Sequence, residues 1–430
     1  MRFRRMGNVT DHRGRRGALT AVVILFAMAV LAVNSLWVRG QERLLAIRGG
    51  QIHTISDGII SDGVILIRGD IIADVGSDVA IPPGADVMDF SENFIMPGIV
   101  SPHSYLGIPP PSSAEQSAAA RNGPSILNLA NYPVRFSIYP ENPVYLSALK
   151  SGITTIAISP RPAGIAGLGA VIAPGGERMT DVVVKKKAFL KINVYANTPF
   201  WDMLKKALED AQKKGDEEKK RAEDKKREKE EDGKKEKSKS ESEEEEEEKI
   251  SETAQVFMDV IEGKLPLMAD CFTPGSLSHL LSLLSGFPNV KVIVVGGPEI
   301  YRAGNLLKEK DIPVILSPEI SRVMRWSRAE RTNYVLKCQV LGLQMAFQAP
   351  GGIQEQRHLF DYLNKLALYG VKKDVLFKGV TIIPAEILGV DRNVGSLEKG
   401  KRADLIVFRN DPLENIPVVE GVVAGGRFVK

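Results

Sequence analysis

Short apolar runs separated by turn residues dominate residues 43–97. The runs are rich in Leu, Ile and Val, and glycine-containing turns lie between them, which is typical of short β-strands. The clearest runs are Leu44–Arg48, Val64–Ile67 and Ile71–Val75. Residues 395–430 have the same texture, with the runs Asp404–Phe408 and Val418–Val423 before a Gly425-Gly426 turn. We therefore expect one small β domain that is built from both ends of the chain.

Residues 98–394 follow a longer period. Apolar runs of strand length alternate with amphipathic patterns of helix length, which indicates a parallel sheet covered by helices on both faces. The strand candidates are Thr154–Ser159, Leu265–Asp270, Val290–Val295, Pro313–Leu316 and Gly342–Phe347. The helix candidates are Leu277–Leu284, Tyr301–Glu309, Gln354–Leu368 and Ala385–Leu388. The predicted fold class is α/β, and a (β/α)8 barrel fits this length, with an open doubly wound sheet as the alternative.

Charged residues interrupt this rhythm at 205–249, where Glu243–Glu248 is an unbroken acidic run. The segment offers no apolar stripe, which predicts an exposed charged helix or a disordered insert. A docking segment for a charged partner is the alternative. Its mixed signs argue against nucleic acid, because acidic side chains repel phosphate. The formal net charge of +4 is also small for 430 residues.

The N-terminus combines a basic tail at residues 1–17 with an apolar run at residues 18–38. About 20 apolar residues suffice to cross a bilayer. Because the basic flank stays in the cytoplasm, a transmembrane anchor here would place the main domain outside it, in a periplasmic or extracellular setting. A cleaved signal peptide, which would release a secreted protein, is the alternative.

Cysteine usage is sparse. Cys271 and Cys338 are the two cysteines, and neither belongs to a CxxC pattern, which argues against a thiolate zinc site. We expect two buried thiols, with a Cys271–Cys338 disulfide as the alternative in an oxidising compartment.

Two sequence segments carry a family resemblance. The first is Asp89–Gly107, which contains Met96-Pro97-Gly98 and ends its core at Pro102-His103, and the second joins Gly379–Val390 to Val394–Val407. Together they resemble the amidohydrolase superfamily, which includes imidazolonepropionase-like and dihydroorotase-like enzymes. The glycine-rich stretch Ile165–Ile172 is similar to an exported subgroup. The resemblance implies a TIM-like barrel at 98–394 and a β-sandwich formed by 43–97 and 395–430.

The resemblance also implies one or two divalent metals, usually zinc, that activate a water molecule. Family ligands are two histidines spaced i and i+2, a carboxylate or modified lysine, two later histidines and an aspartate that serves as general base. Here His103 matches the first histidine, but Tyr105 takes the second position, and a tyrosine with a pKa of about 10 binds zinc poorly. The later strands Leu265–Asp270 and Val292–Gly296 carry no histidine. The run Met345–Gly351 carries no acid.

Few polar residues remain as candidates near the predicted strand ends. His103 is interpreted as a vestigial metal ligand, and Asp270 and Glu299 as weak candidates for a hard cation such as Mg²⁺ or Ca²⁺. Lys191 is a further polar group at a strand end. His12, His53, His279 and His358 are not expected to bind metal. No residue is assigned a catalytic role, and no substrate is predicted.

We therefore expect a degenerate, exported amidohydrolase relative that has lost its metal centre and needs no cofactor. It would act as a binding or partner subunit, with a homologous amidohydrolase chain or a second copy of itself as the partner. The alternative is an active hydrolase of carbon–nitrogen bonds other than peptide bonds. That enzyme would hold zinc or another divalent cation in a non-standard or partner-completed site. A scaffold that docks through the charged segment is a third interpretation.

Overall fold

The computed structural model describes residues 44–110, 112, 127–194, 198–232, 251–325, 328–349 and 355–429. The predicted anchor at 18–38 and the acidic run Glu243–Glu248 lie outside these residues. Among the described residues, no helix combines the length and the apolar character that a membrane crossing requires.

Both ends of the chain form one seven-stranded sheet, in the order β18-β17-β16-β4-β1-β2-β3. Its strands are β1 (Leu44–His53), β2 (Ile59–Arg68), β3 (Ile71–Gly76), β4 (Asp86–Pro97), β16 (Leu405–Phe408), β17 (Val419–Ala424) and β18 (Arg427–Phe428). The two ends of the chain meet where β16 pairs with β4, with Leu405 opposite Pro97. Strands from both ends of the chain therefore belong to one hydrogen-bonded sheet, whereas the sandwich arrangement stays a prediction.

Eight strands form a nearly closed barrel, in the order β15-β12-β11-β10-β9-β8-β7-β5. They are β5 (Ile99–Ser104), β7 (Ile153–Ile158), β8 (Gly164–Ile172), β9 (Val183–Asn193), β10 (Leu267–Cys271), β11 (Val292–Gly296), β12 (Val314–Leu316) and β15 (Met345–Phe347). A short strand, β6 (Leu127–Asn128), pairs with β8 outside this path. At the seam the Ala349 amide donates to Ser101 Oγ at 3.4 Å. The five strands predicted in the middle of the chain are confirmed.

Strand β8 departs from the predicted all-parallel arrangement. It runs antiparallel to both β7 and β9, whereas the neighbouring pairs β9–β10, β10–β11, β11–β12 and β12–β15 are parallel. Only residues 159–163 separate β7 from β8, which is too short for the crossover that a parallel strand needs. The glycines of β8 permit close packing, because a Cβ on Gly169 would meet the Phe189 ring at 2.1 Å. The prediction of a regular (β/α)8 barrel is therefore wrong at this strand.

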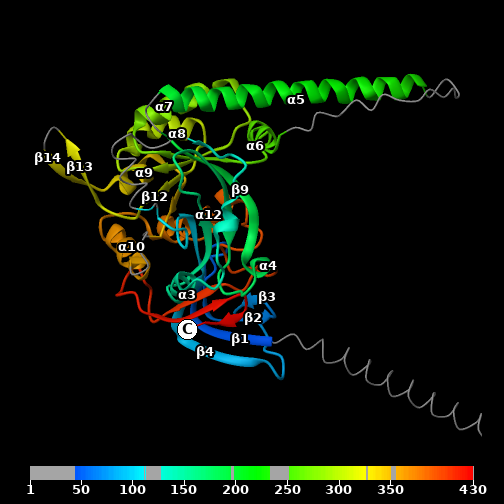
Figure 1. Ribbon diagram of the computed structural model, residues 1–430. Helices are drawn as coiled ribbons and strands as arrows, with labels where there is room; N and C mark the ends of the chain where they lie inside the picture. Colours follow the sequence, from blue (N-terminus) through cyan, green and yellow to red (C-terminus); the bar gives the residue numbers. More distant parts are fainter. Residues whose placement is uncertain are drawn as a thin grey trace, which may run out of the picture.

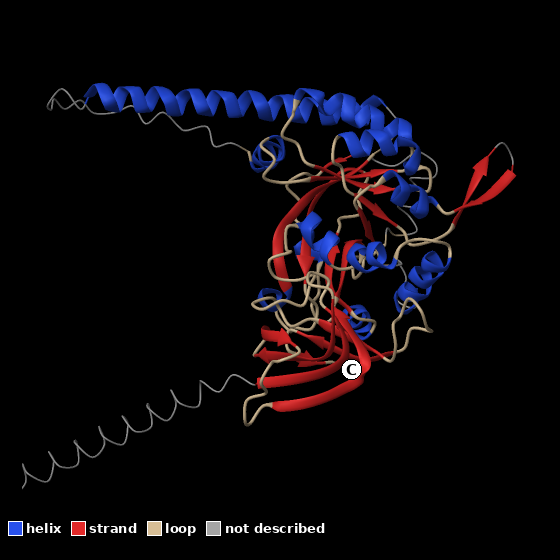
Figure 2. Ribbon diagram, turned by 180° about the vertical axis from the view of Figure 1, so that it is seen from behind, coloured by secondary structure: helices blue, strands red, loops and turns tan. Residues whose placement is uncertain are grey.

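Helices cover the outside of the barrel (Figures 1 and 2). The α-helices are α3 (Pro143–Lys150), α4 (Met179–Val182), α5 (Thr198–Asp232), α6 (Glu252–Ile261), α7 (Pro274–Leu283), α8 (Gly304–Glu309), α9 (Tyr334–Leu341), α10 (Leu359–Leu368), α11 (Lys373–Gly379) and α12 (Ile382–Leu388). Short 3-10 helices are η1 (Val134–Ser137), η2 (Leu284–Gly286), η3 (Ile300–Ala303) and η4 (Glu355–His358), and a hairpin is formed by β13 (Ser321–Arg325) and β14 (Arg328–Thr332). All four predicted helical segments are helical over their described residues.

The interior of the barrel is apolar over most of its depth. Val100, Met268, Ile315 and Ala346 come from four different strands and pack in one buried cluster. Helix α12 contributes Leu388 to the same cluster and thereby fills the end of the barrel at which the strands begin. The polar side chains of the interior are consequently found toward the other end, where the parallel strands finish.

Helix α5 begins as part of the body and ends outside it. Phe200, Leu204, Leu208 and Ala211 are buried in the main core, so the early part of the charged segment does have an apolar stripe. The stripe ends at Gly215, whose Cβ position faces Met258 of α6. Beyond that point the described side chains of α5 are exposed, and the helix extends past the body in both views (Figures 1 and 2).

Candidate functional site

His103 lies at the end of β5, at the mouth of the barrel where family active sites are found. The side chain is buried, and its Nδ1 is 3.0 Å from Oε1 of Gln348, which follows β15. Because Oε1 accepts, Nδ1 carries the proton, and Nε2 remains a buried acceptor without a hydrogen-bond partner. Burial, reinforced by the nearby Lys191 charge, lowers the pKa of His103 to about 4. The imidazole is therefore neutral at physiological pH.

Lys191 and Asp270 form a buried ion pair beside this histidine. They lie on the adjacent parallel strands β9 and β10, and Lys191 Nζ donates to Asp270 Oδ1. The lysine is fully buried and Asp270 is 8% exposed. Burial lowers the pKa of Lys191, and the attraction of Asp270 partly offsets that effect. Both charges act on the pKa of His103, which places the three side chains in one electrostatic unit.

Tyr105 occupies the position of the second family histidine. Its ring meets the His103 ring edge-on, with 4.9 Å between the ring centroids. The Arg161 guanidinium lies 4.6 Å from the Tyr105 ring centroid and donates to the backbone oxygens of Tyr105 and Ile108, both at 3.2 Å. Arg161 and Gln348, like Ser159 and Asn193 described next, are residues of this mouth that the sequence analysis did not single out. A search for polar side chains of any type near the predicted strand ends, in place of acids and histidines alone, would have found them.

Two further polar atoms at the mouth have no partner. Ser159 follows β7, and its Oγ is buried without a hydrogen bond. Asn193, the last residue of β9, donates from Nδ2 to the Pro162 oxygen at 2.5 Å, while its Oδ1 is left unpaired. Buried polar atoms normally have partners, so these atoms and His103 Nε2 define a mouth that can accept a hydrogen-bonding ligand.

Glu299 precedes η3 and forms an ion pair with Arg302 at 3.3 Å, and both side chains are between one-third and two-fifths exposed. Asp270 is buried and paired with Lys191. The cation site that combines Asp270 and Glu299 stays a prediction.

The donor set does not fit a zinc ion. Zinc sites in proteins use three or four His, Cys or carboxylate ligands. Among the residues that the structure describes, no group of three such side chains is arranged to hold a metal ion. Asp270 forms an ion pair with the Lys191 ammonium group, and the positive charge of Lys191 would repel a cation placed at the His103 ring. Cys271 and Cys338 are free and buried, as predicted, and burial raises the pKa of each thiol to about 12.

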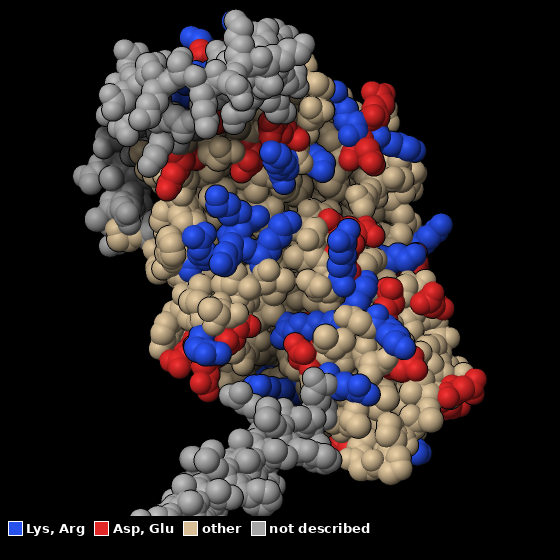
Figure 3. Space-filling model, turned by 90° about the vertical axis from the view of Figure 1, so that its right-hand side faces the viewer, with Lys and Arg blue, Asp and Glu red and all other residues tan. Residues whose placement is uncertain are grey.

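A hollow of about 970 Å³ lies at the opposite end of the barrel, where β10, β11 and β12 begin. Its lysines are Lys185, Lys264, Lys291 and Lys310. Figure 3 shows the side of the molecule that carries α4 and α6 in Figure 1, and basic side chains gather across it. Helices α6 and α8 end at this hollow, and helix C-termini favour cations. The lysines therefore have a structural explanation that requires no ligand.

Comparison with known proteins agrees with this geometry. The amidohydrolase family model matches residues 354–429. An amidohydrolase from Thermotoga maritima MSB8 superposes with a TM-score of 0.72 at 22% identity, covering 90% of this chain and 99% of that chain. An adenosine deaminase from Xanthomonas campestris with bound zinc gives a TM-score of 0.53 at 13% identity, with 89% and 92% covered. A Xaa-Pro dipeptidase with methionine in its active site gives 0.53 at 14% identity, with 90% and 99% covered. No curated protein sequence matches the chain.

The chain therefore shares the TIM-like barrel fold of solved amidohydrolases, and its C-terminal part, residues 354–429, matches the amidohydrolase family model, in agreement with the resemblance of its sequence motifs. One of the solved structures with this fold, the deaminase, holds zinc.

Proposed function

We propose that this chain is an amidohydrolase-fold protein without a metal centre, which acts as a binding or partner subunit. One observation carries the proposal: the buried Asp270 carboxylate beside His103 is paired with the Lys191 ammonium group, so neither group is free to bind a metal ion. Hydrolysis in this family depends on a metal that lowers the pKa of water. With the neutral His103 beside an ammonium group, this mouth has hydrogen-bonding groups for recognition but no group that generates hydroxide.

Zinc analysis of the full chain tests this proposal. The protein would be produced with added zinc and bicarbonate, so that Lys191 has the opportunity to become a carboxylated ligand, and then dialysed. We expect far less than one zinc per chain in the wild type and in the Asp270→Asn variant alike. One or more tightly held zinc ions in the wild type, lost in Asp270→Asn and accompanied by hydrolysis of an N-acyl or lactam substrate, would overturn the proposal.

The alternative function is an active hydrolase whose cation site is completed by a partner chain. Its support is that metal-dependent relatives share the fold, including the deaminase with bound zinc. This alternative predicts that Asp270→Ala and Glu299→Ala each abolish activity in the assembled protein. Our proposal predicts that these variants change stability alone.

The oligomeric state is tested separately. Light scattering of the purified chain, alone and mixed with a homologous amidohydrolase chain, would reveal the predicted partner or second copy.

We also propose that residues 18–38 hold the protein at a membrane, with the main domain outside the cytoplasm. The support is the basic tail followed by a 21-residue apolar run. Protease added to intact cells after removal of any outer barrier should degrade the main domain. Mass analysis of the mature protein should find an intact N-terminus. A mature chain that starts near residue 39 would show instead that a signal peptide is cleaved.

A further inference from the structure

The membrane anchor proposed for residues 18–38 ends close to the body of the protein, and the inference below rests on that anchor. Five residues, 39–43, lie between the apolar run and Leu44, where β1 begins. An extended chain spans at most about 3.3–3.6 Å per residue, so Leu44 stays within roughly 20 Å of the bilayer. A compact domain of about 390 residues has a radius of gyration of about 21 Å. The tether is therefore too short for the far side of the body to meet the membrane.

The start of β1 lies on the side of the molecule that carries α4 and the lysine-rich hollow (Figures 1 and 3). Leu44 pairs with the end of β2, and Ile72, in the next strand, donates to the backbone oxygen of Lys401 at 2.8 Å. Lys401 belongs to the segment that follows α12, the helix that borders the hollow. There Lys185 Nζ donates to the backbone oxygen of Leu388 at 2.8 Å. Strand pairing, hydrogen bonds and one chain segment thus connect Leu44 with the hollow.

This side of the body carries an excess of positive charge. The hollow is lined by four lysines, one aspartate and one glutamate. The C-termini of α6 and α8 each contribute about half a negative charge, which leaves the lining positive. Two further exposed lysines stand near the start of β9. Together the lysines form the basic face, which consists of Lys185, Lys186, Lys187, Lys264, Lys291 and Lys310.

Most lysines of the basic face are open to solvent and free to meet a ligand. Four of them are exposed and take part in no ion pair within the described part of the chain, namely Lys186, Lys187, Lys291 and Lys310. Lys264 is also exposed but pairs with Glu262 at 2.6 Å. Each lysine near an anionic bilayer strengthens binding by about fivefold, because it attracts the phosphates of the lipids. The basic face therefore suits an anionic phospholipid surface, which the tether brings within reach.

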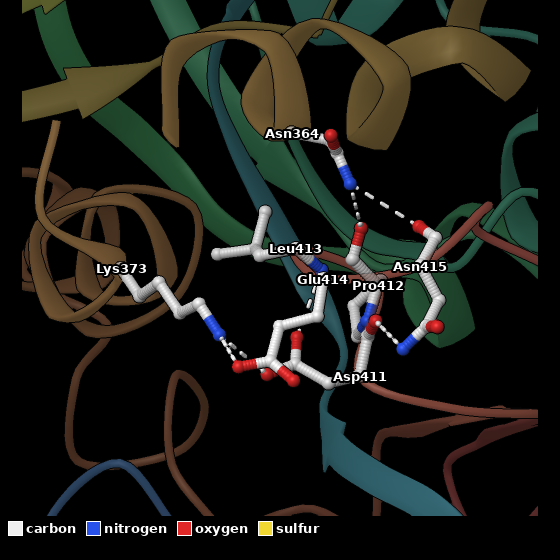
Figure 4. Close-up of polar contacts among 7 residues, drawn as sticks. All are labelled: Asn364, Lys373, Asp411, Pro412, Leu413, Glu414 and Asn415. Atoms are coloured by element: carbon white, nitrogen blue, oxygen red, sulfur yellow. Dashed lines mark hydrogen bonds and ion pairs between the residues drawn. The ribbon is translucent and has the colours of Figure 1, made fainter. Parts of the chain in front are cut away.

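Polar contacts fasten the β domain, which carries the tether, to the barrel helices (Figure 4). Asn364 of α10 donates to the backbone oxygens of Pro412 and Asn415 at 3.3 and 3.2 Å. Lys373 of α11 forms an ion pair with Asp411 at 3.2 Å. These contacts join the barrel helices to the connection between β16 and β17. A tether on β1 therefore restrains the orientation of the barrel as well as that of the β domain.

We propose that the basic face rests on a membrane surface that contains anionic phospholipid, with the mouth of the barrel turned away from the bilayer. The length of the tether, the position of Leu44 and the distribution of charge all select the same side of the molecule. The mouth lies at the other end of the barrel, where the parallel strands finish. This orientation leaves the mouth open to a partner in solution, whereas the reverse orientation would press it against lipid.

Quenching of a fluorescent label by nitroxide groups on lipid headgroups tests this orientation in the full chain. The label is attached at Ser285→Cys, beside the hollow, or at Gly275→Cys, at the other end of α7, where an added side chain meets open space. Cys271 and Cys338 are buried and remain unlabelled. In nanodiscs that contain phosphatidylglycerol we expect several-fold stronger quenching at residue 285 than at residue 275. High salt should reduce the difference, because it screens exposed charges.

Two triple variants separate the basic face from positive charge in general. The first changes to Gln three residues of the basic face, Lys187, Lys291 and Lys310. The second changes to Gln three exposed lysines elsewhere, Lys150 of α3, Lys337 of α9 and Lys365 of α10. The first should lower the ratio of docked to undocked protein at least about tenfold, and the second should leave it unchanged. Equal quenching at the two labels, or the same quenching in nanodiscs of phosphatidylcholine alone, overturns the proposal and leaves an acidic protein as the ligand of this face.

Sedimentation of the full chain with vesicles distinguishes failure of this proposal from failure of the anchor. A chain with a working anchor sediments with neutral phosphatidylcholine vesicles, whatever the state of its lysines. If that chain shows no difference between the two labels, the anchor stands and the orientation is refuted. Sedimentation with phosphatidylglycerol vesicles alone, reversed by salt, supports the basic face without the anchor. A chain that sediments with neither kind of vesicle refutes both.

Discussion

At the scale of single residues, Lys191 decides the chemistry of the barrel mouth. A fully buried ammonium group is costly unless a carboxylate pairs with it, and Asp270 provides that carboxylate from the next strand. Burial keeps the neighbouring His103 neutral, and the lysine charge adds to this effect while Asp270 partly opposes it. The protonation of His103 therefore depends on both members of the pair.

Replacing Lys191 with Met should destabilise the protein by about 3–5 kcal/mol, because it leaves a buried carboxylate without its partner. The double variant Lys191→Met with Asp270→Leu removes both charges and should recover most of that loss. Urea unfolding of the wild type, both single variants and the double variant gives the coupling between the two sites. Equal stability of Lys191→Met and the wild type would contradict the buried ion pair.

The pKa of His103 predicts a pH dependence of stability. The folded-state pKa of about 4 lies below the ordinary 6.5, so the unfolded chain takes up a proton that the folded chain refuses. The stability of the folded state should therefore fall as pH decreases from 6.5 toward 4, by up to roughly 3 kcal/mol from this residue alone. His103→Gln should lack this component. Urea unfolding at pH 7, 6, 5 and 4 checks it, and parallel pH profiles for the two proteins would refute it.

The sequence could identify His103 but not its surroundings. The motif that ends in Pro102-His103 locates the mouth of the barrel, and the spacing identifies Tyr105 as a departure from the family. The contact between Lys191 and Asp270 joins residues 79 positions apart, and it depends on the register of two strands. Gln348 meets His103 only because the barrel nearly closes, which pairs residues 245 positions apart. Local patterns contain no information about such registers.

At the scale of elements, strand β8 and helix α5 are the two irregular parts of the barrel. The glycine-rich run that forms β8 has a low local preference for the strand conformation, because glycine is depleted in strands. It becomes a strand because hydrogen bonds to β7 and β9 outweigh that local preference. In α5, the packed part is marked by a few apolar side chains, of which Leu208 and Ala211 lie among charged residues. Both features result from tertiary packing, which sequence periodicity does not detect.

Shortening the charged segment should leave the barrel intact if its boundary is chosen from the structure. We expect that replacing residues 220–250 with a short Gly–Ser linker changes the thermal midpoint by no more than about 2 °C, which corresponds to less than about 1 kcal/mol. Leu208→Ala, within the packed part of α5, should cost about 2–5 kcal/mol. Differential scanning calorimetry compares the two. A large destabilisation by the linker variant would mean that residues 220–250 contact the body.

At the scale of the whole molecule, the β domain and the barrel meet at a tightly packed junction around Gly98. Strand β4 continues into β5 through Gly98, whose amide donates to the backbone oxygen of Asp404 in the β domain at 2.9 Å. The next amide, of Ile99, donates to the backbone oxygen of Gly152 in the barrel at 2.9 Å. Gly152 has φ +88°, and a Cβ there would meet Ile406 of β16 at 2.5 Å. The two parts should therefore unfold together.

Gly98→Ala tests that coupling. The added Cβ would lie 2.1 Å from Thr154 Oγ1, a contact that forces the junction apart. Overpacking of this kind typically costs about 1–3 kcal/mol. Native-state hydrogen exchange should show a similar loss of protection in β1 and in β10, one strand from each part. Loss confined to the β domain, with β10 as protected as in the wild type, would show that the parts unfold separately.

The pairing of β16 with β4 also sets the order of events during synthesis. Ribosomes add residues at about 5–20 per second, so the edge of β4 waits roughly 15 to 60 s before residues 405–408 emerge to cover it. A bare strand edge recruits other chains. The nascent protein is consequently exposed to aggregation through the edge of β4 throughout this interval, and a ribosome that stalls before residue 405 should release a product prone to aggregate.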